Sequence, residues 1–149
     1  MRIDLTTPEG RQAANEAAAR LCGFRQAALI PSHTGEMVWV HRERRGATVH
    51  APDFLAGLRP DGTCDESKVN GELLWMVWCA IKAVSNEVAL WWGAPEGAGD
   101  WCWNCSEYID QCIGATASHA HPVAALLLVA DALKLLDIAR AEGKGAKTP

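Results

Sequence analysis

The chain has 149 residues, enough for one domain of ordinary size, and 49% of them are apolar, which supports a packed core rather than wholesale disorder. Its formal charge is −4 and its pI is about 5.7, so it lacks the basic excess that general nucleic-acid binders present to phosphates. The apolar stretch at residues 122–130 is far shorter than the ~20 residues that a membrane span needs.

The first residues lack the apolar segment of a secretory signal peptide. This predicts a cytoplasmic protein, where thiols stay reduced. We therefore expect the six cysteines to be core thiols or metal ligands rather than disulfides.

The first half of the chain predicts one helix and a hairpin. Thr7 is a suitable N-cap with Pro8 at the first helical position, and Gly23 supplies a stop. Residues 37–41 are typical of a strand, residues 42–46 of a turn, and residues 47–50 of a short partner strand. The sequence places residues 26–71 least well.

The second half predicts a helix at residues 67–84, strands at 87–92 and 101–109, and a last helix from Pro122 to about Ala141. Between Leu73 and Val84 only Lys82 is charged, so this helix is apolar nearly all round. Such a helix is buried on more than one side or buries one side in another subunit, which makes it a candidate homo-oligomer interface.

The order of elements predicts an α+β fold. We expect a small antiparallel sheet packed with three main helices, in the order α-β-β-α-β-β-α, because strands that follow directly are most simply antiparallel. The sequence does not decide whether the first hairpin belongs to the same sheet. A single domain should cover residues 1–142, and the Gly- and Lys-containing residues 143–149 should form a disordered tail.

Three features of the chain are shared with a known group of proteins. They are the opening helix at residues 13–23, Trp91 and Trp103 in the hairpin, and the segment His121-Pro122-Val123-Ala124-Ala125-Leu126 at the last helix. Together they resemble small phage accessory proteins of the NinX and ABA-sandwich type. The resemblance implies a phage or prophage protein in a bacterial host cell, and it brings no catalytic residues with it.

Five thiol and imidazole side chains form the sharpest candidate metal site: Cys102, Cys105, Cys112, His119 and His121. Zinc favours four such ligands in a tetrahedron, and a Cys-x-x-Cys pair is the usual first half of a structural site. On a regular strand, however, Cys102 and Cys105 point to opposite faces, and the later ligands lack a paired spacing. We therefore expect no cofactor and small buried cysteines, with zinc binding as the alternative.

The chain contains seven tryptophans but only one tyrosine and two phenylalanines. Most are expected in the core. Trp91 and Trp92 must point to opposite faces of their strand, so at least one faces away from the main core unless the sheet is covered on both sides. The alternative is an exposed aromatic platform that anchors a partner protein or stacks a base. The candidate binding tryptophans are Trp39, Trp91, Trp92 and Trp103.

The densest positive cluster is the turn that contains Arg42, Arg44 and Arg45. Three guanidinium groups at a hairpin tip can grip phosphates bidentately. The alternative is a solvated turn that keeps a sheet edge soluble.

The sequence contains no nucleophile elbow, Walker phosphate loop, zinc-protease motif or dinucleotide fingerprint. We therefore expect a non-enzymatic protein. The leading hypothesis is a phage accessory protein that binds and inhibits a host antiviral defence component. The alternatives are a protein that sequesters a nucleotide signal and a zinc-stabilised structural or regulatory module.

Overall fold

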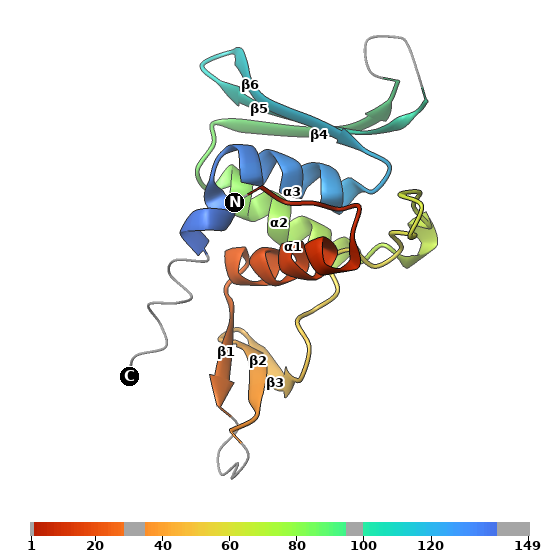
Figure 1. The fold of residues 1–149 in the computed structure, drawn as a ribbon. Helices are drawn as coiled ribbons and strands as arrows, with labels where there is room; N and C mark the ends of the chain where they lie inside the picture. The colour runs from red at the N-terminus through yellow and green to blue at the C-terminus, as the bar shows by residue number, and fades with distance from the viewer. Residues whose placement is uncertain (1, 29–34, 95–99, 140–149) are drawn as a thin grey trace.

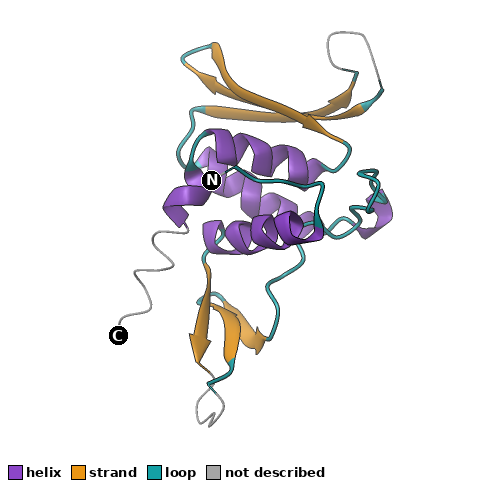
Figure 2. Ribbon diagram, viewed as in Figure 1, coloured by secondary structure: helices purple, strands orange, loops and turns teal. Residues whose placement is uncertain are grey.

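The computed structural model describes residues 2–28, 35–94 and 100–139. Three helices form a central layer between two small sheets (Figures 1 and 2). In chain order the elements are α1 (Pro8–Leu21), β1 (Phe24–Ala28), β2 (Met37–His41), β3 (Arg44–Thr48), a 3-10 helix (Glu66–Lys68), α2 (Gly71–Lys82), β4 (Glu87–Gly93), β5 (Cys102–Ile109), β6 (Cys112–His119) and α3 (Pro122–Ala132). The predicted α+β class is confirmed. The predicted tail, residues 143–149, lies outside the described residues.

The strands form two antiparallel sheets with the orders β1-β2-β3 and β4-β5-β6, so the first hairpin belongs to a sheet of its own. The strands β1 and β6 were not predicted. β6 follows β5 through a tight turn at Asp110 and Gln111, which have φ values of 49° and 69°. Such turns usually have glycine after Asn or Asp, and Gln111 stands in that place, so the sequence gives little indication of this one. In the first hairpin the turn is shorter than predicted, because β3 already begins at Arg44.

The start of α1 agrees with the sequence. The Thr7 side chain accepts a hydrogen bond from the Gly10 backbone N–H at 3.0 Å, and Pro8 is the first helical residue. Gly23 has a φ of +90°, a conformation that glycine adopts without strain, and it turns the chain from α1 into β1.

The predicted second helix, residues 67–84, is divided. Glu66–Lys68 form one 3-10 turn, and Asn70 then caps α2 by accepting hydrogen bonds from Glu72 N and Leu73 N. The cap places the true helix start at Gly71. The helix buries one face, with Leu73, Val77 and Ile81, and exposes the other.

The predicted last helix, from 122 to about 141, is interrupted. It ends at Ala132, Lys134 takes a φ of 60°, and residues 135–139 are helical again. The Lys134 backbone N–H donates to the Asp131 carbonyl oxygen at 2.9 Å, a three-residue bond that closes a tighter turn than an α-helix does.

The core lies around α3, where nearly every residue from Pro122 to Ala130 is buried. The β4–β6 sheet covers one side of this helix, and α2 and α1 lie on the other side (Figure 1). Within the described parts of the chain, no helix is both long and apolar enough to cross a membrane.

Candidate functional site

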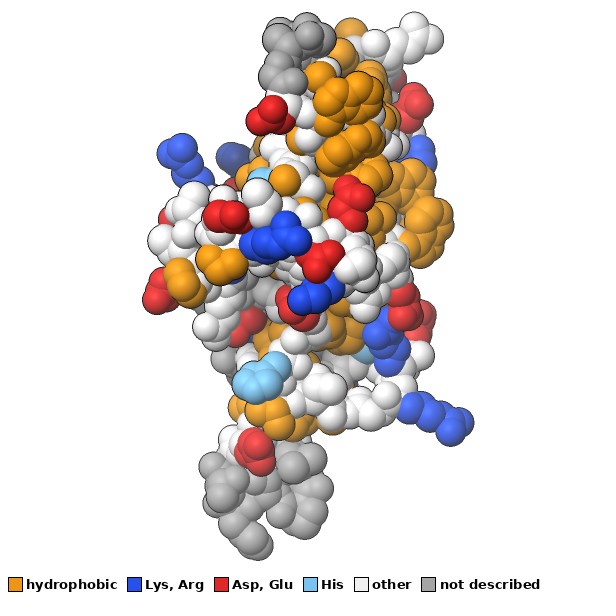
Figure 3. Space-filling view, turned by 90° about the vertical axis from the view of Figure 1, so that its right-hand side faces the viewer, with side chains coloured by type: hydrophobic (Ala, Val, Ile, Leu, Met, Phe, Trp, Pro, Cys, Tyr) orange, Lys and Arg blue, Asp and Glu red, His pale blue; other side chains and the backbone are white. Residues whose placement is uncertain are grey.

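Four tryptophans lie at the surface and define what we name the tryptophan surface. They are Trp75, Trp91, Trp92 and Trp101, with exposed fractions of 58%, 45%, 44% and 64%. Figure 3 shows hydrophobic side chains gathered in a band near the β4–β5 hairpin that continues toward the helices. Exposed tryptophans at this density are unusual, because large apolar side chains normally fill the core.

Two of these tryptophans each pack against another tryptophan. Trp75 stacks on Trp78, with ring centroids 5.0 Å apart and planes at 14°. Trp92 meets Trp103 edge to face, with centroids 5.5 Å apart. The Trp103 indole N–H also donates to Glu66 Oε1 at 3.2 Å, which ties the sheet to the 3-10 helix. The exposed rings of Trp75 and Trp92 are therefore positioned by contacts within the chain.

Trp91 and Trp92 occupy opposite faces of β4, as predicted. Trp92 lies opposite Trp103, on the face that carries the buried Val88 and Cys105, whereas Trp91 lies opposite Asn104 on the outer face. β4 is an edge strand of the sheet, and both rings are nearly half exposed, so tryptophan is accessible on both faces at this position of the strand.

A second candidate site lies beside the β1–β3 sheet. A pocket of about 380 Å³ is lined there by eleven residues, among them Phe24, Trp39, His41, Arg44 and Arg45. The structure thus brings together three of the predicted binding residues, Trp39, Arg44 and Arg45. The third arginine of the predicted basic turn, Arg42, is exposed and does not line the pocket. We name this feature the basic pocket.

The charges around the basic pocket are partly compensated. Arg44 pairs with Glu72 of α2, and its guanidinium carbon lies 5.6 Å from the Phe24 ring centroid. Trp39 is only 4% exposed, and the guanidinium of Arg20 lies over its ring at 5.1 Å. Trp39 therefore serves as a wall of the pocket rather than as the exposed stacking platform of the sequence hypothesis.

The five predicted zinc ligands are not brought together. Cys102 pairs with Gly93 at one end of the β4–β6 sheet, whereas Cys112 pairs with Ile109 at the other end, about 20 Å away along the strand. Cys105 is buried, and burial raises the pKa of its thiol to about 12, which disfavours the thiolate that zinc requires.

The two predicted histidine ligands are engaged in the fold. His119 Nδ1 accepts the His121 backbone N–H at 2.9 Å. His121 caps α3, with Nδ1 accepting from Val123 N at 3.1 Å and Nε2 lying 2.9 Å from the Ala56 carbonyl oxygen. Among the described residues, no three His, Cys, Asp or Glu side chains are grouped so as to hold a metal ion.

The sequence hypothesis missed one polar residue, Glu107. It is 1% exposed and lies on the inner face of β5, on the same side as Cys105 and Trp103. The sequence pattern of β5 could have revealed Glu107. Side chains alternate between the two faces of a strand, and Glu107 occupies a position that the alternation assigns to the core.

No protein-family model matches this chain, and no curated protein or solved structure shows significant similarity to it.

Proposed function

We propose that this chain is a non-catalytic binding protein that captures a partner protein on its tryptophan surface. The observation that carries the proposal is the exposure of four tryptophans, between 44% and 64% each. Tryptophan is enriched at the energetic centres of protein interfaces, where its large ring buries much area at little entropic cost.

The arrangement of the rings supports a protein partner rather than a small ligand. The exposed rings come from α2, β4 and the residue before β5, so they span several elements instead of lining one closed pocket. Trp75 and Trp92 are each packed on another indole, which reduces the entropy lost on binding.

The partner that we propose is a protein of the bacterial host, in particular a component of antiviral defence, bound in the cytoplasm. The sequence resemblance to phage accessory proteins supports this choice, and so does the lack of catalytic motifs. A protein that blocks a target by binding needs only a surface.

Affinity capture from a bacterial lysate tests the proposal when single variants are compared. Trp75→Ala and Trp92→Ala should each weaken capture of a stoichiometric host partner by tenfold or more, in line with the cost of about 2 kcal/mol that defines an interface hot spot. Val49→Ala is the matched control, because Val49 is 56% exposed and lies between Thr48 and His50, which line the basic pocket. Capture that survives both tryptophan changes would refute the role of this surface.

Self-association is the competing outcome for the same surface. Native mass spectrometry of the purified protein measures whether the chain forms a dimer. A dimer that dissociates in the Trp75→Ala variant would assign α2 to an oligomer interface instead of to a host protein.

The basic pocket favours a second candidate function, the sequestration of a nucleotide signal. Its support is the convergence of Trp39, Arg44 and Arg45 on one pocket of about 380 Å³. Nucleotides should quench tryptophan fluorescence saturably, and Arg45→Glu should weaken the effect at least tenfold, whereas Arg42→Glu, outside the pocket, should leave it unchanged. An absence of quenching by linear and cyclic nucleotides would eliminate this function.

A further inference from the structure

The inner face of β5 carries a buried carboxyl group that is not satisfied within the described structure. Glu107 is 1% exposed, and neither of its side-chain oxygens has a hydrogen-bond partner among the described residues. Burying an unpaired carboxylate is costly, because the protein interior does not replace the water that the charge loses. A buried carboxyl group without a partner in a native protein therefore needs an explanation.

The neighbouring strand provides space for this carboxyl group. A Cβ atom built on Gly114 of β6 would lie 2.7 Å from Glu107 Oε1 and 3.2 Å from its Cδ. A glycine within a strand is typical of a place where another group approaches closely. The carboxyl group is thus accommodated by the sheet itself.

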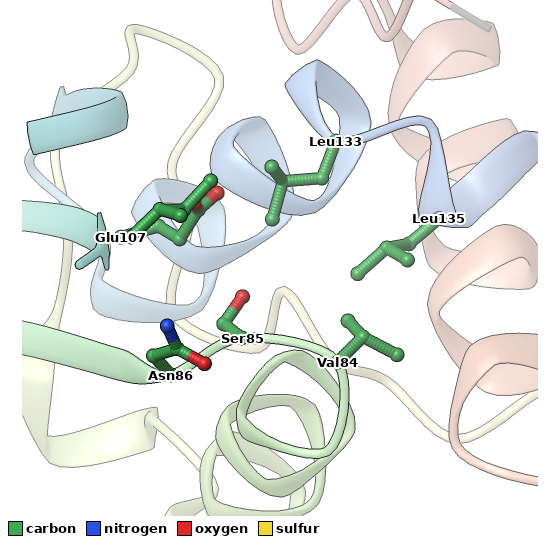
Figure 4. A pocket seen from close by; sticks show the side chains of 7 residues that line it. Val84, Ser85, Asn86, Glu107, Leu133 and Leu135 are labelled. Atoms are coloured by element: carbon green, nitrogen blue, oxygen red, sulfur yellow. The ribbon is translucent and has the colours of Figure 1, made fainter.

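Glu107 also lines a pocket of about 270 Å³ at the end of the helical layer. The other lining residues are Val84, Ser85, Asn86, Ile109, Leu133 and Leu135. Figure 4 shows the Glu107 side chain reaching from β5 toward α3, with the Ser85 hydroxyl directed into the same space and Val84 and Leu135 facing each other across it. The pocket therefore combines one acid and one hydroxyl with an aliphatic wall.

Two helix ends make this place electronegative. α2 ends at Lys82, and the residues that follow its C-cap, Val84 to Asn86, line the pocket. α3 ends at Ala132, and its C-cap Leu133 lines the opposite wall. The carbonyl ends of helices carry partial negative charge and favour cations. Lys82, the nearest basic residue of α2, donates to the Asn86 carbonyl oxygen at 2.5 Å and not to Glu107.

We propose that this pocket binds a small primary alkylammonium ion. The ammonium group donates hydrogen bonds to the Glu107 carboxylate and the Ser85 hydroxyl, and the alkyl chain packs on Val84, Leu133 and Leu135. At about 30 Å³ per water, the volume corresponds to about nine water molecules, which suits a short alkyl amine. A metal ion fits less well, since no group of three metal-ligating side chains exists among the described residues.

Binding of n-butylammonium chloride, measured by calorimetry and by the thermal unfolding midpoint, tests the proposal. The wild-type protein should bind butylammonium saturably, and 1-butanol, its neutral isostere, should bind at least tenfold more weakly. Glu107→Gln keeps the shape and removes the charge, so it should also lose at least tenfold in affinity. Glu87→Gln, an exposed glutamate of β4, is the matched control and should bind like the wild type.

A second variant keeps the test decisive if Glu107→Gln fails to fold. Leu135→Trp fills the pocket from the other wall while leaving Glu107 in place, and it should abolish binding. Equal binding of butylammonium and butanol, or undiminished binding in both Glu107→Gln and Leu135→Trp, would overturn the proposal. Because the tryptophan surface is separate from this pocket, Trp75→Ala should leave amine binding unchanged.

Discussion

The imidazole of His121 joins two segments that are 65 residues apart in the chain. Its Nε2 lies 2.9 Å from the Ala56 carbonyl oxygen, and its Nδ1 accepts the backbone N–H of Val123 at the start of α3. Because Nδ1 accepts, Nε2 carries the single proton and donates it to Ala56. The fold therefore requires the neutral ring.

This arrangement predicts a loss of stability in mild acid. Burial lowers the pKa of His121, and of His119, below the ordinary value of 6.5. The unfolded chain then takes up protons first as the pH falls, so the free energy of unfolding is at its full value above about pH 6.5 and decreases below it. Each histidine should contribute a slope of at most about 1.4 kcal/mol per pH unit.

Denaturant unfolding between pH 8 and pH 4.5 measures this slope. His121→Asn keeps an N-cap acceptor but does not titrate, so it should be less stable at pH 8 and show a flatter decline. Hydrogen bonds from Thr6, Thr63 and Ser67 lower the pKa values of Asp4, Asp61 and Asp65 below the ordinary value of 3.8. Their contribution to the free energy of unfolding is therefore lost mainly below pH 3.8, outside this range. An unchanged slope in His121→Asn would show that His121 does not titrate in this range.

The cysteines should differ sharply in reactivity. Burial raises the pKa of Cys22 and Cys105 to about 12 in each case, whereas Cys79 and Cys112 are exposed. A pKa three units above the usual 9 lowers the thiolate fraction about 1000-fold. Iodoacetamide at pH 8, followed by peptide mass spectrometry, should label Cys79 and Cys112 first and Cys105 only on unfolding. Equal rates at Cys105 and Cys112 would contradict the burial of β5.

The contact between Gly114 and Glu107 can be tested by a double-mutant cycle. Gly114→Ala should destabilise the protein by about 1–3 kcal/mol, because its Cβ would lie 2.7 Å from Glu107 Oε1. In a Glu107→Ala background the same change should have little effect. Equal costs in the two backgrounds would mean that the two residues do not meet.

The importance of α3 for stability is also testable. Leu126 is completely buried, so Leu126→Ala should lower the free energy of unfolding by about 2–5 kcal/mol. Ile113→Ala, at a position that is 65% exposed, should change it by less than about 0.5 kcal/mol. Urea unfolding of both variants provides the comparison, and similar losses would place the core elsewhere.

The sequence was informative where strong local chemistry decides the structure. Thr7 with Pro8 predicted the start of α1, and Pro122 predicted the start of α3. The sequence did not predict elements whose local signal is weak or whose position depends on contacts with distant residues. The tight turn at Asp110 and Gln111 lacks the glycine that usually occupies such turns, so β6 was missed.

The candidate sites show the same division. The sequence singled out Trp39, Arg44 and Arg45, and the structure places them in one pocket, which required the unpredicted segment near Pro52. It grouped Cys102 with Cys112 by spacing, but an antiparallel hairpin sets them at opposite ends. Glu107 stood at an inward position of a predicted strand, yet only the neighbouring Gly114 reveals that the site accommodates a carboxyl group.

The separation of the two sheets has a consequence for the order in which the molecule opens. The β1–β3 sheet extends away from the helical layer, because β1 leaves the end of α1 (Figure 1). It meets the rest of the molecule at that junction, through the buried Phe24 and Trp39 and through the pair of Arg44 with Glu72, so it shares little of the core around α3. Segments with few buried contacts exchange their amide hydrogens through local rather than global opening. The sheet should therefore exchange well before α3, and a ligand in the basic pocket would slow that exchange without affecting the helical centre.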